Sequence, residues 1–372
     1  MKIELCSSIP CLQVRINGSD PLWFLLDTGA QVTVIDNETA RLLGLNSEGS
    51  FKGEGGGEGT IEVSLVNDIT ITLADLSVTI AMAAVAPIRS LLESHMGRRV
   101  HGVLGYDLIS QYVIEIDYAA KEITFNDPAN YQHSGKGEVV PIAIANNHPH
   151  IRATIFHFSE QAIEADFVVD TCASSELSLA TAFVNKYRFI ESGTATHQAL
   201  VVGAGGIALT PVGRVERVQV GSFIIDRPVA YFSQDKGGAF GGLLGADGII
   251  GAEFLRRFTV IFDYPGEKMI LEPNNHFNEP YEGDAISLTG MSVTAEGDDL
   301  KTFRINTLLE QSPAAIAGIK EEDIILAVDG TPASNIDLEQ LCRCLIKQKK
   351  VQLSVKRADD YLDVAINITR PI

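Results

Sequence analysis

Polar and apolar residues alternate over many short segments of this chain, with the period of two that is typical of β-strands with one buried face. Residues 11–18 and 22–29 form one pair of such segments, and an Asn-Gly turn signal lies between them. That combination favours a β-hairpin. Residues 150–156 and 162–170 show the same arrangement. The pattern therefore predicts a mostly β protein.

One long segment of the chain is repeated. Residues 248–271 align without a gap to residues 102–125, 146 positions earlier, and apolar residues run in parallel. Four positions are identical in the two copies: Gly102 and Gly248, Gly105 and Gly251, Asp117 and Asp263, Tyr118 and Tyr264. Self-similarity at a fixed offset indicates duplicated structural units. We therefore expect two pseudo-symmetric β lobes, assigned to residues 1–135 and 136–276.

The C-terminal part of the chain has a different pattern. Residues 272–284 are rich in Pro, Asn and charged residues and are interpreted as a linker. Ser312 and Pro313 are suited to the N-cap and first position of a short helix. Residues 336–347 have the apolar spacing of an amphipathic helix. With the strand patterns around them, these features predict a small α+β domain over residues 281–372.

Composition and charge narrow the class of protein. The chain has 45% hydrophobic and 21% charged residues and a formal net charge of -19, which argues against nucleic acid or an anionic membrane as partner. No apolar run approaches the length of a membrane span, and no signal peptide is evident at the N-terminus. We expect a cytoplasmic protein, or a periplasmic or secreted one if a leader has been removed.

The five cysteines do not form a regular disulfide framework, because their number is odd and their spacing is irregular: Cys6, Cys11, Cys172, Cys342 and Cys344. We interpret the cysteines as scattered free thiols, and a short-loop bridge between Cys6 and Cys11 in an oxidising compartment is the alternative. We interpret His148 and His150 as surface residues, since no third metal ligand follows at suitable spacing. No metal or organic cofactor is expected.

Two short motifs carry the candidate chemistry. Residues 24–31 read FLLDTGAQ and residues 167–174 read FVVDTCAS, so that Asp27 and Asp170 each follow an apolar strand pattern. A pseudo-twofold arrangement of the lobes would bring the two carboxyl groups together. Two carboxyl groups a few ångström apart share one proton, so one can act as base on a water while the other acts as acid.

The motifs, their spacing and the duplication resemble the lobes of pepsin-like and retroviral-type aspartic proteases, over about three-quarters of the chain. The resemblance implies a catalytic pair of Asp27 and Asp170, a polypeptide substrate and an endopeptidase activity. It also implies that Thr28 and Thr171 cross-link the two loops and that Gly29 gives backbone contact to its carboxylate. Because both lobes lie in one chain, we expect a monomer.

Departures from the family pattern raise two questions. Many pepsin-like enzymes have Ser or Thr where this chain has Ala30 and Ala173. One fewer donor to the carboxylate predicts a pH optimum less acidic than that of pepsin. Cys172 stands where the motif has glycine. The dyad could be asymmetric and active, it could be impaired so that the chain is a peptide-binding scaffold, or the thiol could be a redox switch.

Glycine-rich stretches at residues 52–62 and 201–209 are candidates for two flaps over the substrate, as in the retroviral pattern. Loose turns without substrate contact are the alternative. The expected flap residues are Gly55, Gly56, Gly57, Gly203 and Gly205.

Residues 312–335, with Ser-Pro-Ala, Ala-Gly-Ile, Asp-Ile-Ile and Asp-Gly, resemble the core of bacterial PDZ domains. A protease followed by such a domain resembles a bacterial arrangement. The resemblance implies that Gly290 and Met291 hold a peptide C-terminus and that Leu338 lines the groove. The alternative is a blocked groove in a domain that only packs against the lobes.

Overall fold

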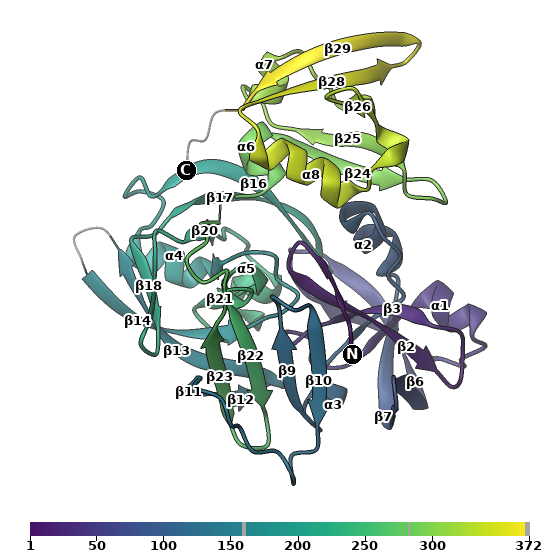
Figure 1. Ribbon diagram of the computed structural model, residues 1–372, viewed down its shortest axis with the longest axis vertical. Helices are drawn as coiled ribbons and strands as arrows, with labels where there is room; N and C mark the ends of the chain where they lie inside the picture. The colour runs from purple at the N-terminus through teal and green to yellow at the C-terminus, as the bar shows by residue number, and fades with distance from the viewer. Residues whose placement is uncertain (158–160, 282, 369–372) are drawn as a thin grey trace.

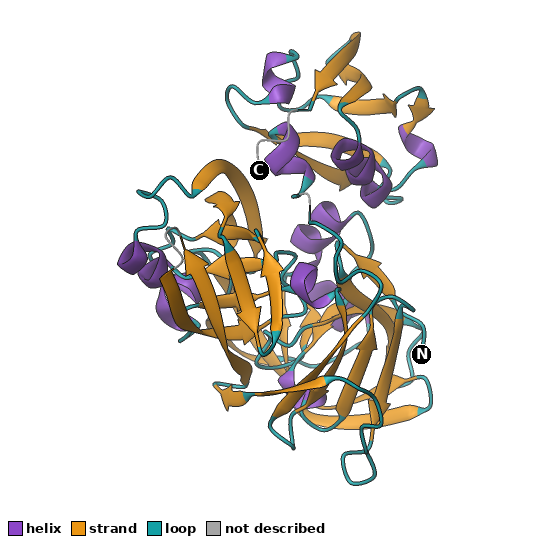
Figure 2. Cartoon of the chain, turned by 60° about the vertical axis from the view of Figure 1, so that its left-hand side comes forward, coloured by secondary structure: helices purple, strands orange, loops and turns teal. Residues whose placement is uncertain are grey.

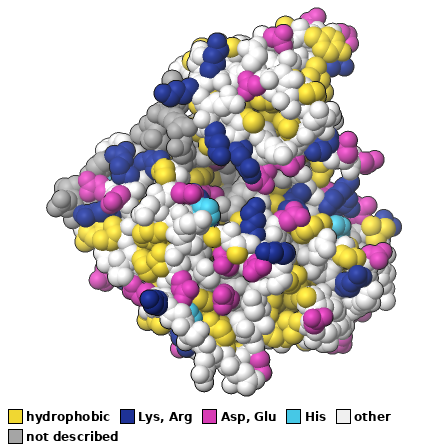
Figure 3. Space-filling view, viewed as in Figure 1, with side chains coloured by type: hydrophobic (Ala, Val, Ile, Leu, Met, Phe, Trp, Pro, Cys, Tyr) yellow, Lys and Arg dark blue, Asp and Glu magenta, His cyan; other side chains and the backbone are white. Residues whose placement is uncertain are grey.

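The computed structural model describes residues 1–157, 161–281 and 283–368. Two β-rich lobes lie side by side, and a third, smaller domain sits over both of them (Figures 1 and 2). The molecule is mostly β, as the alternation of polar and apolar residues predicts. Acidic and basic side chains are mixed over the face shown in Figure 3.

The first lobe is built on an eight-stranded sheet that follows the order β1-β2-β3-β8-β4-β7-β6-β5. Its strands are β1 (Glu4–Cys6), β2 (Ile9–Ile16), β3 (Leu22–Leu26), β4 (Val34–Asp36), β5 (Glu48–Glu54), β6 (Thr60–Leu73), β7 (Leu76–Ala86) and β8 (Gly102–Leu104). Three helices accompany them: α1 (Asn37–Leu42), α2 (Arg89–Met96) and α3 (Tyr106–Ile109).

The second lobe repeats this plan in a ten-stranded sheet of order β16-β17-β20-β15-β21-β14-β13-β18-β19, with β12 beside β13. Its strands are β12 (Ala143–Ala145), β13 (His148–His157), β14 (Gln161–Val169), β15 (Leu177–Leu179), β16 (Ala195–Gly203), β17 (Gly206–Arg214), β18 (Arg217–Val220), β19 (Phe223–Asp226), β20 (Val229–Phe232) and β21 (Gly248–Ile250). Its helices are α4 (Thr181–Tyr187), the π-helical turn η1 (Ala239–Leu243) and α5 (Ala252–Leu255).

A five-stranded sheet joins the lobes in the order β10-β9-β22-β23-β11. It contains β9 (Val113–Asp117), β10 (Glu122–Asn126), β11 (Glu138–Pro141), β22 (Phe258–Asp263) and β23 (Lys268–Pro273). At its centre the repeated strands β9 and β22 pair antiparallel, with Glu115 opposite Ile261. Those two residues are also equivalent under the 146-residue repeat, so the pseudo-twofold axis passes between them. One hydrophobic core runs from both lobes into this sheet.

The third domain is a six-stranded sheet with its own core. It contains β24 (Met291–Glu296), β25 (Thr302–Leu308), β26 (Ile324–Val328), β27 (Thr331–Pro332), β28 (Lys350–Arg357) and β29 (Asp360–Asn367). Its helices are α6 (Ala285–Thr289), α7 (Pro313–Ile316), the 3₁₀ turn η2 (Ala333–Asn335) and α8 (Leu338–Lys347). Ser312 caps α7 and Pro313 begins it, as predicted. The predicted limits of this domain include residues 282 and 369–372, which lie outside the described residues.

The segment interpreted as a linker is anchored to the second lobe. The buried Arg257 guanidinium donates to the backbone oxygens of Phe277 and Glu279 and pairs with the buried Glu176. Charge-assisted hydrogen bonds are stronger than neutral ones. They hold this segment against the lobe, although its Pro- and Asn-rich composition predicted a linker. Within the described residues, no helix is long and apolar enough to cross a membrane.

Candidate active site

The two aspartates occupy equivalent places in the two lobes. Strands β3 and β14 end immediately before the Asp-Thr motifs, and each pairs in parallel with the strand of the repeated Gly-apolar-apolar segment. The Asp27 amide donates to the Leu104 oxygen at 3.0 Å, and the Asp170 amide donates to the Ile250 oxygen at 3.0 Å. Strands β8 and β21 therefore fix the backbone position of both aspartates from behind.

The threonines after the aspartates cross-link the lobes at the pseudo-twofold axis. The Thr28 hydroxyl donates to the Val169 oxygen at 2.7 Å, and the Thr171 hydroxyl donates to the Leu26 oxygen at 2.6 Å. Each hydroxyl also accepts the amide of the other threonine, at 3.0 and 3.1 Å. Both side chains are buried. These four symmetric hydrogen bonds satisfy two hydroxyl groups, two amides and two carbonyl oxygens at the buried axis.

The Asp27 and Asp170 carboxyl groups hydrogen-bond to each other. Burial, followed by the charge of Asp170, raises the pKa of Asp27 well above its ordinary value, and burial raises the pKa of Asp170. Among the described residues, Asp170 accepts the backbone amides of Cys172 and Ala173, at 2.7 and 3.2 Å, and Asp27 accepts the backbone amide of Gly29, at 2.8 Å. More donors favour the anion. The two backbone donors favour the anion on Asp170, and the pair shares one proton between its carboxyl groups.

Gly29 is required by the close approach of the opposite carboxyl group. A Cβ at this position would lie 2.6 Å from Cγ of Asp170, far inside van der Waals contact. At the equivalent place in the second lobe the chain has Cys172, whose thiol acts on the Asp27 carboxyl group to lower its pKa. The site is thus asymmetric: one aspartate faces a glycine and the other faces a sulfur.

The Cys172 thiol is a neutral donor and not a thiolate. Burial, together with the charges of Asp27 and Asp170, raises its pKa well above the ordinary value for cysteine. A reactive redox cysteine needs the opposite shift. The structure therefore supports an S–H group that donates to Asp27 and stabilises its ionised form.

The two glycine-rich hairpins, one from each lobe, contact each other at their tips. Strands β5 and β6 form one hairpin, and β16 and β17 form the other. The Gly59 amide donates to the Gly205 oxygen at 2.8 Å, and the Gly205 amide donates to the Gly56 oxygen at 2.6 Å. Side chains would prevent this approach, since a Cβ at Gly203 would lie 2.5 Å from the Gly56 oxygen.

The other predicted flap glycines lie in the same contact. A Cβ at Gly55 would come within 2.8 Å of the Ala204 Cβ, and one at Gly57 within 2.9 Å of the Gly205 backbone. The Gly55 oxygen accepts the Ala239 amide at 3.0 Å, which ties the first tip to η1. The two hairpin tips together form one structure that spans both lobes. We refer to residues 52–62 and 201–209 as the glycine roof.

The interpretation of His148 and His150 as surface residues was wrong. Both are buried, because β13 lies between β12, β14 and β18. The His150 Nδ1 lies 2.7 Å from an Asp166 oxygen. The His148 ring lies beside the backbone of Gly29, in the opposite lobe, and burial lowers the pKa of the ring. His148 thus helps to position the first Asp-Thr loop, a role that no motif in the sequence indicated.

Cys6 and Cys11 are free thiols whose sulfurs lie 3.4 Å apart. Among the described residues, no group of three or more His, Cys, Asp or Glu side chains is arranged to hold a metal ion.

The residues predicted to bind a peptide in the third domain lie together where α6, β24 and α8 meet. Their backbone amides, however, already donate to acceptors within the domain. The Gly290 amide donates to the Ile286 oxygen at 2.7 Å, and the Met291 amide donates to the Thr289 hydroxyl at 3.2 Å. Leu338 is buried, and a Cβ at Gly97 of the first lobe would lie 2.4 Å from its Cβ.

Two pseudo-symmetric β lobes, an aspartate from each at the shared axis and a threonine cross-link behind them define a protein with the two-lobed fold of aspartic proteases. The model of the aspartyl protease family matches residues 12–108 and 155–254, more than half of the chain, and the chain belongs to this family. A PDZ domain model matches residues 304–357. The third domain is therefore a PDZ domain.

Solved structures similar to this chain include an aspartic proteinase from Irpex lacteus, with 12% identity, a TM-score of 0.49 and coverage of 75% of this chain and 98% of that one. Basic 7S globulin from soybean has 11% identity and a TM-score of 0.43, covering 75% and 95%. The HtrA3 PDZ domain bound to a phage-derived ligand has 23% identity and a TM-score of 0.20, covering 22% and 83%. No curated protein sequence matches this chain.

Proposed function

We propose that this chain is an aspartic endopeptidase that hydrolyses peptide bonds through a water activated between Asp27 and Asp170. The observation that carries the proposal is the hydrogen-bonded carboxyl pair, in which backbone donors make Asp170 the better anion and Asp27 the better acid. An extended polypeptide would lie between this pair and the glycine roof.

The proposed reaction uses the proton asymmetry directly. Asp170 removes a proton from the water as its oxygen bonds to the carbonyl carbon, and Asp27 gives its proton to the carbonyl oxygen. The neutral tetrahedral intermediate then returns a hydroxyl proton to Asp27, while Asp170 delivers its proton to the amide nitrogen. The C–N bond breaks, leaving a carboxylic acid and an amine. The pair ends with one proton, as it began.

In this proposal the PDZ domain binds the C-terminal segment of a polypeptide and so brings substrates or partners to the protease. The family model for this domain supports peptide binding. The alternative to an active enzyme is an impaired protease that binds peptides without cleaving them, and Cys172 in place of glycine is the feature that favours it.

The test is cleavage of an unstructured protein, such as reduced casein, by the wild-type chain. Asp27→Asn and Asp170→Asn should each lower the rate by about 10²–10⁴-fold, because each removes one acid–base partner. A pepstatin-type inhibitor should block cleavage. Asp68→Asn is a matched control, since Asp68 is exposed on the first lobe. A wild-type rate no higher than that of Asp27→Asn would support the scaffold alternative and refute the proposal.

A further inference from the structure

Helix α2 of the first lobe lies against the part of the PDZ domain that would receive a peptide. In Figure 1 it sits directly below β24 and α8, and α2 and β24 are in contact. PDZ-type recognition adds an extended peptide as a new strand along a sheet edge, beside an adjacent helix. Strand β24 is the end strand of the described PDZ sheet, so this is the edge in question.

Burial of β24 shows that the strand is covered on both faces. Met291 and Ala295 belong to the PDZ core. Ser292 and Thr294 alternate with them and point to the other face, yet they are only 3% and 6% exposed. The outer face of an end strand is normally solvated. Material from outside the PDZ sheet therefore covers it, and α2 is an element of the protease that contacts this strand.

The turn after α2 makes a close contact with the start of α8. Gly97 ends α2 in the left-handed conformation, with φ 64°. A Cβ on Gly97 would lie 2.4 Å from the Cβ and 3.2 Å from Cδ2 of Leu338. The first residue of α8, which was predicted to line the peptide groove, is thus in contact with the backbone of the protease lobe.

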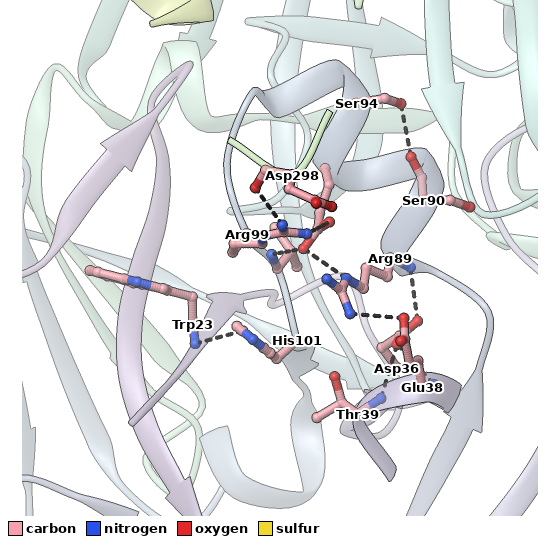
Figure 4. A network of polar contacts seen from close by, with 12 residues as sticks. Trp23, Asp36, Glu38, Thr39, Arg89, Ser90, Ser94, Arg99, His101 and Asp298 are labelled. Atoms are coloured by element: carbon pink, nitrogen blue, oxygen red, sulfur yellow. Dashed lines mark hydrogen bonds and ion pairs between the residues drawn. The ribbon is translucent and has the colours of Figure 1, made fainter. Parts of the chain in front are cut away.

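An ion-pair network holds α2 in this position (Figure 4). Arg99 donates to the Asp298 backbone oxygen of the PDZ domain at 2.6 Å and to Glu93 at 2.9 Å. Glu93 is buried and also accepts Arg89 Nε at 3.0 Å and the Val100 amide at 3.1 Å. Because the carboxylate is buried and fully bonded, the network is stronger than a surface ion pair.

The end of the groove that would hold a carboxylate is closed as well. The amides of Gly290 and Met291 donate to Ile286 and Thr289 within the same segment. A peptide carboxylate would have to replace these internal acceptors. Two separate features of the chain therefore compete with a ligand: the contact of α2 with the groove and the internal bonding of the loop.

We propose that α2 is an internal occupant of the PDZ groove and that a peptide with a free C-terminal carboxylate and an apolar last residue competes with it. This inference rests on the proposed peptide-binding role of the PDZ domain and is independent of hydrolysis. The partner is thus an extended peptide C-terminus, and its binding releases α2 from β24 and α8.

A short segment of the chain connects the turn after α2 to the strand behind the Asp27 loop. The segment after α2 continues through His101, whose Nδ1 accepts the Trp23 amide at 3.1 Å, into β8. Strand β8 ends at Leu104, which binds the Asp27 amide. The turn that contacts Leu338 is therefore joined by a continuous segment to the strand that supports Asp27.

The test uses Gly97→Ala, with Gly44→Ala as its matched control. Both glycines follow a helix of the first lobe and have similar φ angles, 64° and 66°. Among the described residues no atom lies within 4 Å of a Cβ at Gly44, whereas that at Gly97 collides with Leu338. Both substitutions therefore cost similar backbone strain, and only Gly97→Ala pushes α2 away from the PDZ domain.

All proteins in the experiment are full-length and carry Asp27→Asn, so that peptides are not cut. The probe is a fluorescein-labelled pentapeptide pool with four degenerate positions and Val, Leu, Ile or Phe at the free C-terminus; the amidated pool is the control. Binding is measured by anisotropy. Hydrogen–deuterium exchange is followed over residues 89–99 and 291–296.

We expect Gly97→Ala to raise exchange in both segments and to bind the free-carboxylate pool at least about tenfold more tightly than the reference and Gly44→Ala proteins. Saturating peptide should also raise exchange of residues 89–99 in the reference protein, a result that needs no substitution at the interface. Equal exchange in Gly97→Ala and Gly44→Ala would overturn the docked position of α2. Raised exchange without tighter peptide binding would overturn the competition.

Discussion

The Cys172 thiol faces the carboxyl group of Asp27 and acts to lower its pKa, across the pseudo-twofold axis from the place where Gly29 faces Asp170. The position normally taken by glycine in the second motif thus carries a donor for the aspartate of the other lobe. Ala30 and Ala173 remove the hydroxyl donors that many pepsin-like enzymes have at the following position. Cys172 supplies part of that function from the opposite side.

Removal of the thiol should shift the pH dependence of activity toward alkaline values. The S–H bond favours the ionised form of Asp27, so Cys172→Gly should raise the pKa values of the pair. Both limbs of the kcat/KM profile against pH would then move upward. Cys172→Ser is the matched control, because it keeps a donor, and it should stay nearer to the wild type. A downward shift in Cys172→Gly would contradict the assigned bond.

The same experiment addresses the alternative of an impaired enzyme. If the sulfur crowded the catalytic water, Cys172→Gly would increase kcat strongly at every pH. We expect no such general gain, because the thiol bonds to Asp27 and has a defined place beside the pair. A gain of about 10²-fold or more at the pH optimum, the size of a full acid–base contribution, would show that the natural site is impaired.

The threonine cross-link should contribute to stability as well as to geometry. Thr28→Val leaves the Val169 oxygen and the Thr171 amide without their partner in a buried site. Each buried group left unsatisfied costs about 1–3 kcal/mol, so we expect the free energy of unfolding to fall by roughly 2–6 kcal/mol. Thr28→Ser keeps the hydroxyl and should lose far less. Urea unfolding monitored by Trp23 fluorescence measures both; equal losses would refute the role of the hydroxyl.

Much of this architecture could be predicted from the sequence because duplication leaves a local signal. The 146-residue repeat gave the two lobes, and the pairing of Glu115 with Ile261 confirms the symmetry it implied. The Ser-Pro pair likewise located the start of α7. These features depend on residues close together in the chain or on a direct copy of a segment.

The features that the sequence did not reveal depend on contacts between distant segments. His148 was interpreted as a surface residue because no third metal ligand follows at suitable spacing, yet β13 is an inner strand and the His148 ring reaches Gly29, 119 positions earlier. The contact of Gly97 with Leu338 also joins two domains. Nothing in the local sequence pattern around Gly97 identifies a partner 241 positions away.

Burial of the carboxyl pair should make stability depend on pH. The pKa values of Asp27 and Asp170 are raised in the folded protein, so the folded state binds more protons than the unfolded state above the ordinary carboxyl pKa of about 4. The contribution of the protonated pair to the free energy of unfolding is fully present below that pH. It is lost as pH rises through the pKa values of the pair in the folded protein. Asp27→Asn removes the effect, so its melting temperature should exceed that of the wild type at pH 7 and the difference should shrink toward pH 4. Exposed Asp68→Asn should show no such trend, and a constant difference for Asp27→Asn would contradict the raised pKa values.

Closure of the glycine roof should be sensitive to a single methyl group. A Cβ on Gly59 would lie 2.4 Å from the Gly205 oxygen, and the Gly59 backbone has no positive φ angle, so Gly59→Ala tests close approach without added strain. We expect the tips to separate and kcat/KM for casein to fall about tenfold or more, because a roof that cannot close admits water and loses contact with the substrate. Gly237→Ala is the control, since among the described residues no atom lies within 4 Å of a Cβ there and its φ angle is not positive either. If Gly59→Ala and Gly237→Ala have the same kcat/KM as the wild type, the hairpins are ordinary turns that take no part in substrate binding.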